Sequence, residues 1–277
     1  MIKQTGNKNI RKIEAHENDK SFLREYFSTH HHFPLFQQVL IETRTDCNNH
    51  CPFCPHHFNN KPFGEMSWEC YKHIIDELVA IGYNGRVALM VSNEPLLEPR
   101  LCEMIEYAKH KSPRLFLDIT TNGRILTLEM VDHLFSIGLD NININDYRGD
   151  RDTFPDKLSS QLVDIAAAYS NNPKITIQKR RLDESWPNYG GNIPQPIDKP
   201  LGFCNLPFRK IVISYDGNVV ICCDDFMNQT SFGNVMEQSL VDCWNNEIFN
   251  QHRHALLEDK RIGICAKCND GQNYSVF

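Results

Sequence analysis

Between residues 38 and 178 the sequence alternates five times between apolar runs and segments with helical spacing of their apolar residues. After Ser67, for example, Ile74, Ile75, Leu78 and Val79 share one helix face, and the pattern stops at Gly82. Strands separated by single helices form a parallel sheet with right-handed crossovers. The sequence therefore predicts an α/β fold, a partial TIM-like (β/α) barrel of five or six strands. The expected strands are 39–45, 86–92, 115–121, 139–145 and 174–178.

The pattern changes after Cys204. The stretch RKIVISYDGNVVICC (209–223) contains two β-rich runs joined by Asp216-Gly217, which predicts a hairpin. A helix is expected near 239–257. The residues before 38 are polar and weakly periodic, and they indicate an arm or a short helical preface. We therefore predict an N-terminal arm (1–37), a barrel (38–200) and a small C-terminal hairpin and helix module (201–277).

The eleven cysteines are unusual for a chain of 277 residues. A chain of this length can bury a core without disulfides, and no secretory signal is visible, so we expect thiols that serve metals or catalysis in the cytoplasm. The net charge of -6 does not indicate the excess of basic residues that is typical of nucleic-acid-binding proteins. No apolar run approaches the roughly 18 residues that a membrane span needs. Small molecules or peptides are the expected substrates.

Cys47, Cys51 and Cys54 follow the first predicted strand with the spacing C-x3-C-x2-C. A structural zinc site is completed by four ligands, whereas three thiolates on one loop leave a coordination position open. An iron–sulfur cubane held by three thiolates would present one iron to a further ligand. The alternatives are a zinc site completed by a nearby histidine, or thiols that are simply buried. The candidate histidines are His50, His56 and His57.

The stretch DCNNHCPFC (46–54) resembles the signature of the radical S-adenosylmethionine (SAM) superfamily. The resemblance implies that Cys47, Cys51 and Cys54 bind a 4Fe-4S cluster whose fourth iron chelates the methionine part of SAM. It also implies reductive cleavage of SAM to a 5'-deoxyadenosyl radical, which abstracts hydrogen from a substrate C–H bond. An electron donor of the flavodoxin or ferredoxin type is the expected partner.

Further motifs of this family follow the later strands, at the end where a barrel builds its site. SNEP (92–95) resembles the family's GGEP motif, which implies that Asn93 and Glu94 lie at the SAM amino group, although Ser92 and Asn93 replace two glycines. TTNG (120–123) is similar to the ribose-facing stretch. Each motif alone also fits a turn or a helix start. The resemblance assigns Thr121, Asn122 and Asn145 to SAM binding, and Phe53 to packing against adenine.

A second set of cysteines lies in the C-terminal module: Cys204, Cys222, Cys265 and Cys268. A hairpin followed by C-x2-C fits a zinc ribbon, and four thiolates fit a closed 4Fe-4S cluster equally well. The run C-x12-G-x4-C followed by C-x2-C resembles the twitch domain, the shortened form of the SPASM domain. This resemblance implies one auxiliary 4Fe-4S cluster with these four ligands.

Several other residues are candidates for chemistry. Cys223 adjoins a predicted ligand and is expected to face the other way; it could replace Cys222 as a ligand, donate a hydrogen atom to a substrate radical, or simply be packed. Arg181 and Glu184 lie where a barrel opens to its substrate, and they are candidate catalytic residues. Cys70, Cys102 and Cys243 are expected in the core.

These observations predict a radical SAM oxidoreductase that dehydrogenates a small natural-product intermediate, such as an aminosugar or polyol alcohol. The auxiliary cluster would accept an electron. Epimerisation with a thiol hydrogen donor and modification of a ribosomal peptide are the alternative reactions. The remaining alternative is a zinc or iron–sulfur protein without catalytic function. Solvent deuterium separates the first two reactions, because only repair by an exchangeable thiol places deuterium on the product carbon.

Overall fold

The computed structural model describes residues 6–147, 158–179, 187–195 and 202–270. Seven strands in these ranges form one sheet in the order β5-β4-β3-β2-β1-β6-β7. Neighbouring strands are parallel from β5 to β6, and only β7 is antiparallel to its neighbour. The predicted α/β fold with a partial barrel is confirmed. The strands are β1 (Gln38–Ile41), β2 (Arg86–Ala88), β3 (Phe116–Thr121), β4 (Asn141–Asp146), β5 (Ile175–Lys179), β6 (Lys210–Ile213) and β7 (Val219–Val220).

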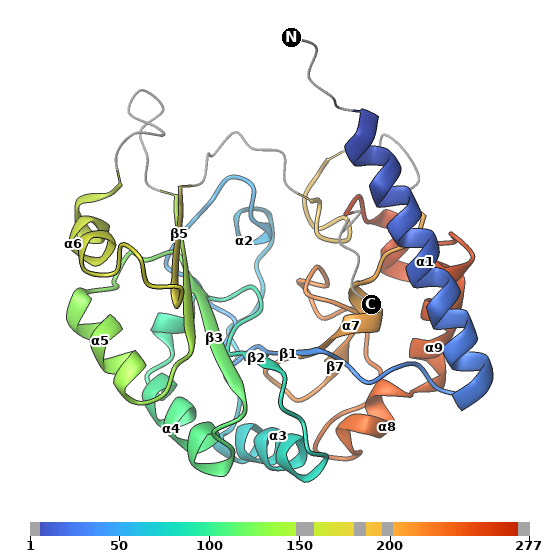
Figure 1. The fold of residues 1–277 in the computed structure, drawn as a ribbon, viewed down its shortest axis with the longest axis horizontal. Coiled ribbons are helices and arrows are strands. Elements are labelled where there is room, and N and C mark those ends of the chain that lie inside the picture. Colours follow the sequence, from blue (N-terminus) through green and yellow to red (C-terminus); the bar gives the residue numbers. More distant parts are fainter. Residues whose placement is uncertain (1–5, 148–157, 180–186, 196–201, 271–277) are drawn as a thin grey trace.

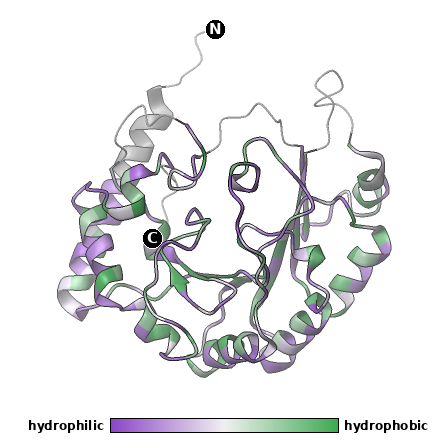
Figure 2. Cartoon of the chain, turned by 180° about the vertical axis from the view of Figure 1, so that it is seen from behind, coloured by the Kyte–Doolittle hydropathy of each residue, from purple (hydrophilic) through white to green (hydrophobic). Residues whose placement is uncertain are grey.

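Four helices alternate with the first five strands and cover the outer side of the sheet (Figure 1). Each carries both hydrophilic and hydrophobic residues (Figure 2), and the apolar ones join strand residues such as Val39 and Leu117 in one buried cluster. Two of these helices begin at a capping hydroxyl: Ser67 Oγ accepts a hydrogen bond from Cys70 N, and Thr127 Oγ1 accepts one from Met130 N. These helices are α3 (Trp68–Ala80), α4 (Leu101–Lys111), α5 (Leu128–Ser136) and α6 (Ser160–Ala168).

The C-terminal module extends the barrel sheet. Its hairpin is confirmed, because β6 and β7 pair Val212 with Val220 across a turn in which Gly217 has a φ of 84°. β6 also pairs in parallel with β1, Val39 lying opposite Ile211. The carboxyl ends of β1 and β6 therefore lie at the same edge, next to the ends of β2, β3 and β4. The division into three domains remains a prediction.

Helix α1 (Gly6–His30) occupies the segment where the sequence predicted an arm or a short preface. It lies beside the C-terminal module (Figure 1), where Lys20 Nζ donates to Asp259 Oδ2 at 2.7 Å. Leu23 is buried in one cluster with Phe203 and Leu256. The sequence did not predict this contact, because α1 contributes few apolar residues to it. His30, at the end of α1, and the following His31 and His32 are exposed.

The helix predicted over 239–257 is two helices, α8 (Leu240–Trp244) and α9 (Glu247–Leu257). Asn246 separates them, since its side chain accepts hydrogen bonds from Ile248 N and Phe249 N and so begins a new helix. No helix in the described ranges has the length and apolar character needed to cross a membrane. The remaining short helices are α2 (Pro55–Phe58), η1 (Pro95–Leu97), α7 (Leu206–Arg209) and η2 (Gly263–Lys267).

Candidate active site

The first cysteine cluster lies on the loop between β1 and α2. Cys54 N donates to Cys51 O at 3.0 Å, which closes a turn, and Pro55 begins α2 directly afterwards. Two amides point at the sulfurs: Asn49 Nδ2 lies 3.1 Å from Cys51 Sγ, and Asn122 Nδ2 lies 3.7 Å from Cys47 Sγ. N–H groups on thiolate sulfur are the usual outer-shell partners of iron–sulfur ligands. This donor set therefore fits a cluster.

Burial raises the pKa of Cys47 to about 11 and that of Cys51 to about 12, and it also raises the pKa of Cys54. These thiols remain protonated near neutral pH unless a cation stabilises the thiolates. Among the described residues, no group of three or more Cys, His, Asp or Glu side chains is arranged to hold a single metal ion. A cubane binds each thiolate to a different iron, so its ligands need not converge on one point.

The predicted SAM-binding residues after β2 and β3 are joined through Glu94. Its buried carboxylate accepts hydrogen bonds from Thr121 Oγ1 at 2.5 Å, Asn122 N at 2.8 Å and Leu96 N at 3.1 Å. Burial raises the pKa of Glu94, while these donors favour its charged form. Glu94 therefore fixes the ends of two strands relative to each other.

Asn93 supplies an available donor beside Glu94. Its Oδ1 accepts a hydrogen bond from Val91 N at 3.0 Å. Its Nδ2 is buried and has no hydrogen-bond partner among the described residues. A buried amide donor left unpaired is costly, so this position suits an acceptor group of a bound cofactor.

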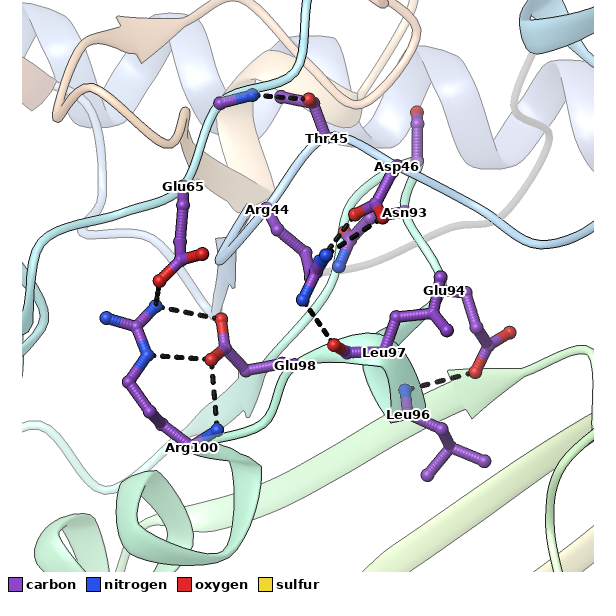
Figure 3. Close-up of polar contacts among 12 residues, drawn as sticks. Arg44, Thr45, Asp46, Glu65, Asn93, Glu94, Leu96, Leu97, Glu98 and Arg100 are labelled. Carbon is purple, nitrogen blue, oxygen red and sulfur yellow. Dashed lines mark hydrogen bonds and ion pairs between the residues drawn. The ribbon is translucent and has the colours of Figure 1, made fainter.

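A charged network supports the loops under the site (Figure 3). Arg44 forms an ion pair with Asp46 and donates to Leu97 O, which connects the cysteine loop to η1. Arg100 pairs with Glu98 and Glu65 at 2.7 and 3.0 Å. These contacts hold the loops after β1 and β2 together.

The structure brings the predicted cofactor residues around one cavity of about 620 Å³. Cys223 lines the same cavity, whereas the predicted catalytic residues Arg181 and Glu184 lie outside the described residues. The predicted residues that line it are Cys47, Cys51, Phe53, Cys54, Asn93, Glu94, Thr121, Asn122, Asn145 and Cys223.

The sequence interpretation missed several residues of this cavity. Tyr147 pairs with Phe53 at a ring-centroid distance of 5.3 Å, and its position just after β4 was a signal that could have found it. Tyr189 has a φ of 49°, in the left-handed region, and precedes two glycines that also have positive φ. Asp224 and Asp270 form part of the wall contributed by the C-terminal module. Asp270 had no signal beyond its closeness to Cys268.

The second cysteine set surrounds a separate cavity. Burial raises the pKa of each of the four thiols, to about 11 for Cys265. The guanidinium of Arg261 lines this cavity and donates to Gly202 O and Asp270 O, both at 2.9 Å. Asp224, Asp225 and Asp270 line the same cavity, so it is the four sulfurs, and not the charge of the lining, that fit a cluster. The four are Cys204, Cys222, Cys265 and Cys268.

Cys222 and Cys223 face different cavities. Cys222 lines the second cavity with the other three cysteines, and Cys223 lines the first. This arrangement supports Cys222 as the auxiliary ligand. Cys70 and Cys243 are buried in the core and Cys102 packs against it, as predicted.

Comparison with known families agrees with this geometry. The family profile of the radical SAM superfamily matches residues 41–146, and that of SPASM, an iron–sulfur cluster-binding domain, matches residues 204–269. The chain belongs to the radical SAM superfamily. Its cofactors are SAM and two 4Fe-4S clusters.

Individual relatives of this radical SAM chain include a dehydrogenase. The S-adenosyl-L-methionine-dependent 2-deoxy-scyllo-inosamine dehydrogenase of Niallia circulans is 28% identical over 242 residues, covering 85% of this chain and 94% of the relative. The crystal structure of BtrN in complex with AdoMet and 2-DOIA superimposes with a TM-score of 0.74 at 25% identity, covering 88% of this chain and 99% of BtrN. The chain is thus a radical SAM oxidoreductase.

A more distant structure shares the fold alone. SuiB of Streptococcus suis, solved bound to the precursor peptide SuiA, superimposes with a TM-score of 0.57 at 13% identity. The match covers 87% of this chain and 78% of SuiB.

Proposed function

We propose that this enzyme oxidises an alcohol of a small cyclitol or sugar that carries an amino group, giving the ketone. The observation that supports this most directly is the charge of the cavity. The C-terminal module contributes Asp224 and Asp270 to its wall, and no Lys, Arg or His is found among the described residues that line it. A cavity with only acidic charged side chains favours a cationic ligand.

Asp224 is the proposed recognition group for the ammonium. Burial, and then the negative charge of Asp270, raise the pKa of Asp224 to about 7. A bound ammonium would stabilise the charged form of the Asp224 carboxylate. The relative from Niallia circulans is named for an amine-bearing carbocycle, and this name supports the same substrate class.

When bound, the two clusters and SAM supply the redox chemistry, in which the alcohol loses a hydrogen atom, a proton and an electron in becoming a ketone. The protein positions the reactants. Glu94 holds Thr121 and Asn122 toward the cavity, and the Phe53–Tyr147 ring pair offers an apolar surface for adenine. Tyr189 lines the cavity near Cys54 and Cys223, where its ring would help to exclude water.

Epimerisation is the second candidate because Cys223 lines the cavity. Burial raises the pKa of its thiol to about 12, so Cys223 keeps its hydrogen at neutral pH, and its Sγ lies 3.9 Å from Asp224 Oδ1. A neutral thiol at this wall is a possible hydrogen-atom donor. In the oxidation that we favour, Cys223 makes packing contacts and takes no part in the reaction.

The test is anaerobic reconstitution with iron and sulfide, followed by dithionite, SAM and 2-deoxy-scyllo-inosamine in deuterated water. We expect 5'-deoxyadenosine and a ketone in equal amounts, with no deuterium on carbon. Deuterium on the carbon of a recovered alcohol would favour epimerisation. The unaltered enzyme should have a KM about 10-fold higher or more for a matched carbocycle that lacks the amine. Asp224→Asn should show a similar rise in KM for the amine substrate, because either change removes one charge of the proposed carboxylate–ammonium pair. Equal KM values for both substrates would refute amine recognition.

We propose a flavodoxin or ferredoxin as the physiological electron donor. It would approach the cysteine loop where His50, Pro52 and His57 are exposed. Replacing dithionite by reduced flavodoxin should sustain turnover.

A further inference from the structure

A buried ion pair closes the base of the loop that carries the three cysteines. Lys61 Nζ donates to Glu42 Oε1 at 2.6 Å, and the two side chains are 4% and 2% exposed. Glu42 follows β1 just before the cysteines, and Lys61 follows α2 just after them. The pair therefore joins the two ends of the cysteine loop. Neither side chain is among the residues that line the 620 Å³ cavity.

The C-terminal module completes this ion pair. Asn228 Nδ2 donates to Glu42 Oε2 at 3.3 Å, and Lys61 Nζ donates to Asn228 Oδ1 at 3.4 Å. The Lys61 ammonium also lies 5.1 Å from the centre of the Phe226 ring. Phe226 and Asn228 come shortly after Cys222 on the same segment. The loop of the first cluster and the segment of an auxiliary ligand thus share one buried network.

Two further contacts connect the same parts. The Phe226 ring packs edge-on against His56 at 4.7 Å, and His56 Nε2 lies 2.8 Å from Ser92 O. Asn59 Nδ2 donates to Asn192 O at 2.7 Å. The segment around Asn192 in turn contacts the auxiliary cysteine loop, since Asn188 Nδ2 donates to Lys267 O at 2.8 Å. The cysteine loop is therefore held by Phe226 and Asn228 of the C-terminal module and by the segment around Asn192, which itself contacts that module.

We propose that Lys61 is a positioning residue through which the C-terminal module fixes the cysteine loop in the shape that binds SAM. Removing one partner of a buried pair leaves the other charge uncompensated, so Glu42 and the loop end must rearrange to reach water. The rearrangement moves Cys47 and Cys54 relative to the ends of β2 and β3. This inference concerns the shape of the loop, and it holds whichever substrate is oxidised.

The test compares Lys61→Met with Lys20→Met in the full-length reconstituted protein. Lys20 is the control, because its side chain is as buried as that of Lys61, but its partners Asp259 and Glu17 are exposed and belong to neither end of the cysteine loop. Both variants lose the ion pairs of a buried lysine, so both should unfold at lower urea concentration, and only Lys61→Met leaves a buried carboxylate without its partner. Only Lys61→Met should raise the dissociation constant of SAM, by about 10-fold, and weaken the change that SAM causes in the electron paramagnetic resonance spectrum of the reduced cluster.

Lys61→Arg keeps the charge and should restore the SAM-dependent spectrum. Should Lys61→Met fail to fold, Asn228→Gly decides the question: Asn228 has a φ of 51°, so glycine keeps the backbone while removing the amide. We expect a rise of about threefold in the SAM dissociation constant for Asn228→Gly, from the loss of its two long hydrogen bonds with Glu42 and Lys61. Equal SAM affinities of Lys61→Met and Lys20→Met, or an unchanged affinity in Asn228→Gly, would overturn the proposal.

Discussion

Replacing Glu94 by glutamine tests whether the ends of β2 and β3 must be joined for SAM to bind. Glu94 is 2% exposed, and its carboxylate accepts three hydrogen bonds, two of which come from Thr121 and Asn122 in the cavity wall. Glutamine has nearly the same shape, so the substitution leaves no cavity. It removes the charge and turns one acceptor oxygen into a donor amide.

The expected loss of SAM affinity in Glu94→Gln depends on which hydrogen-bond donors can find a new partner. The Thr121 hydroxyl can rotate and accept a hydrogen bond from the new amide, but the Asn122 N–H has no such freedom. At least one hydrogen bond to a charged acceptor is lost, which costs about 1.5–3 kcal/mol. If Asn122 moves away to regain a partner, the SAM dissociation constant rises about 10- to 100-fold, because about 1.4 kcal/mol corresponds to a factor of ten.

The assay is equilibrium binding of SAM to the reconstituted protein, with urea unfolding measured alongside. Glu98→Gln is the control: Glu98 is 3% exposed, and its carboxylate accepts from Arg100 at 2.7 and 3.0 Å (Figure 3), but it does not line the cavity. Its loss of stability should be similar, while SAM affinity stays within about twofold. Equal weakening of SAM binding in the two variants would refute the positional role of Glu94, as would unchanged binding in a folded Glu94→Gln protein.

Three further outcomes follow from the structure. Cys204→Ala or Cys265→Ala should lower reconstituted iron from about eight to about four atoms per chain, whereas Cys223→Ala should keep about eight; iron analysis decides, and loss in the Cys223 variant would make it a ligand. Arg253→Met should lower the free energy of unfolding in urea by about 3 kcal/mol, because buried Arg253 donates to two main-chain carbonyl oxygens and lies over two aromatic rings; unchanged stability would contradict this. In the cluster-free protein, Asp224 has a pKa of about 7 in the folded state and 3.8 in the unfolded chain, so the folded state binds the proton more tightly and stability should fall as the pH rises from about 4 to 7. In Asp224→Asn, the urea midpoint should depend less on pH over this range. An equal pH dependence of the midpoint in both proteins would contradict this.

The parts of the site that the sequence predicted are those whose positions follow from topology. In a parallel sheet all carboxyl ends lie at one edge, so residues that directly follow successive strands must meet. Cys47, Glu94, Asn122 and Asn145 satisfy this condition, and they line one cavity. Motif order along the chain was therefore sufficient to place them, even where SNEP departs from the family pattern.

The remaining wall depends on contacts between segments far apart in the chain, and no periodicity predicts them. Asn228 reaches Glu42 across 186 residues, and Asn188 binds Asn269 across 81. Which side chains meet there depends on how irregular turns are shaped, as in the left-handed backbone of Tyr189. Cys223, Asp224, Asn228 and Asp270 belong to the C-terminal module, so the module does more than provide the second cysteine set: it supplies part of the wall of the 620 Å³ cavity and contacts the first cysteine loop. The strand ends thus supply one part of the cavity wall, whereas the irregular turns of the C-terminal module supply another part, which the strand pattern alone could not predict.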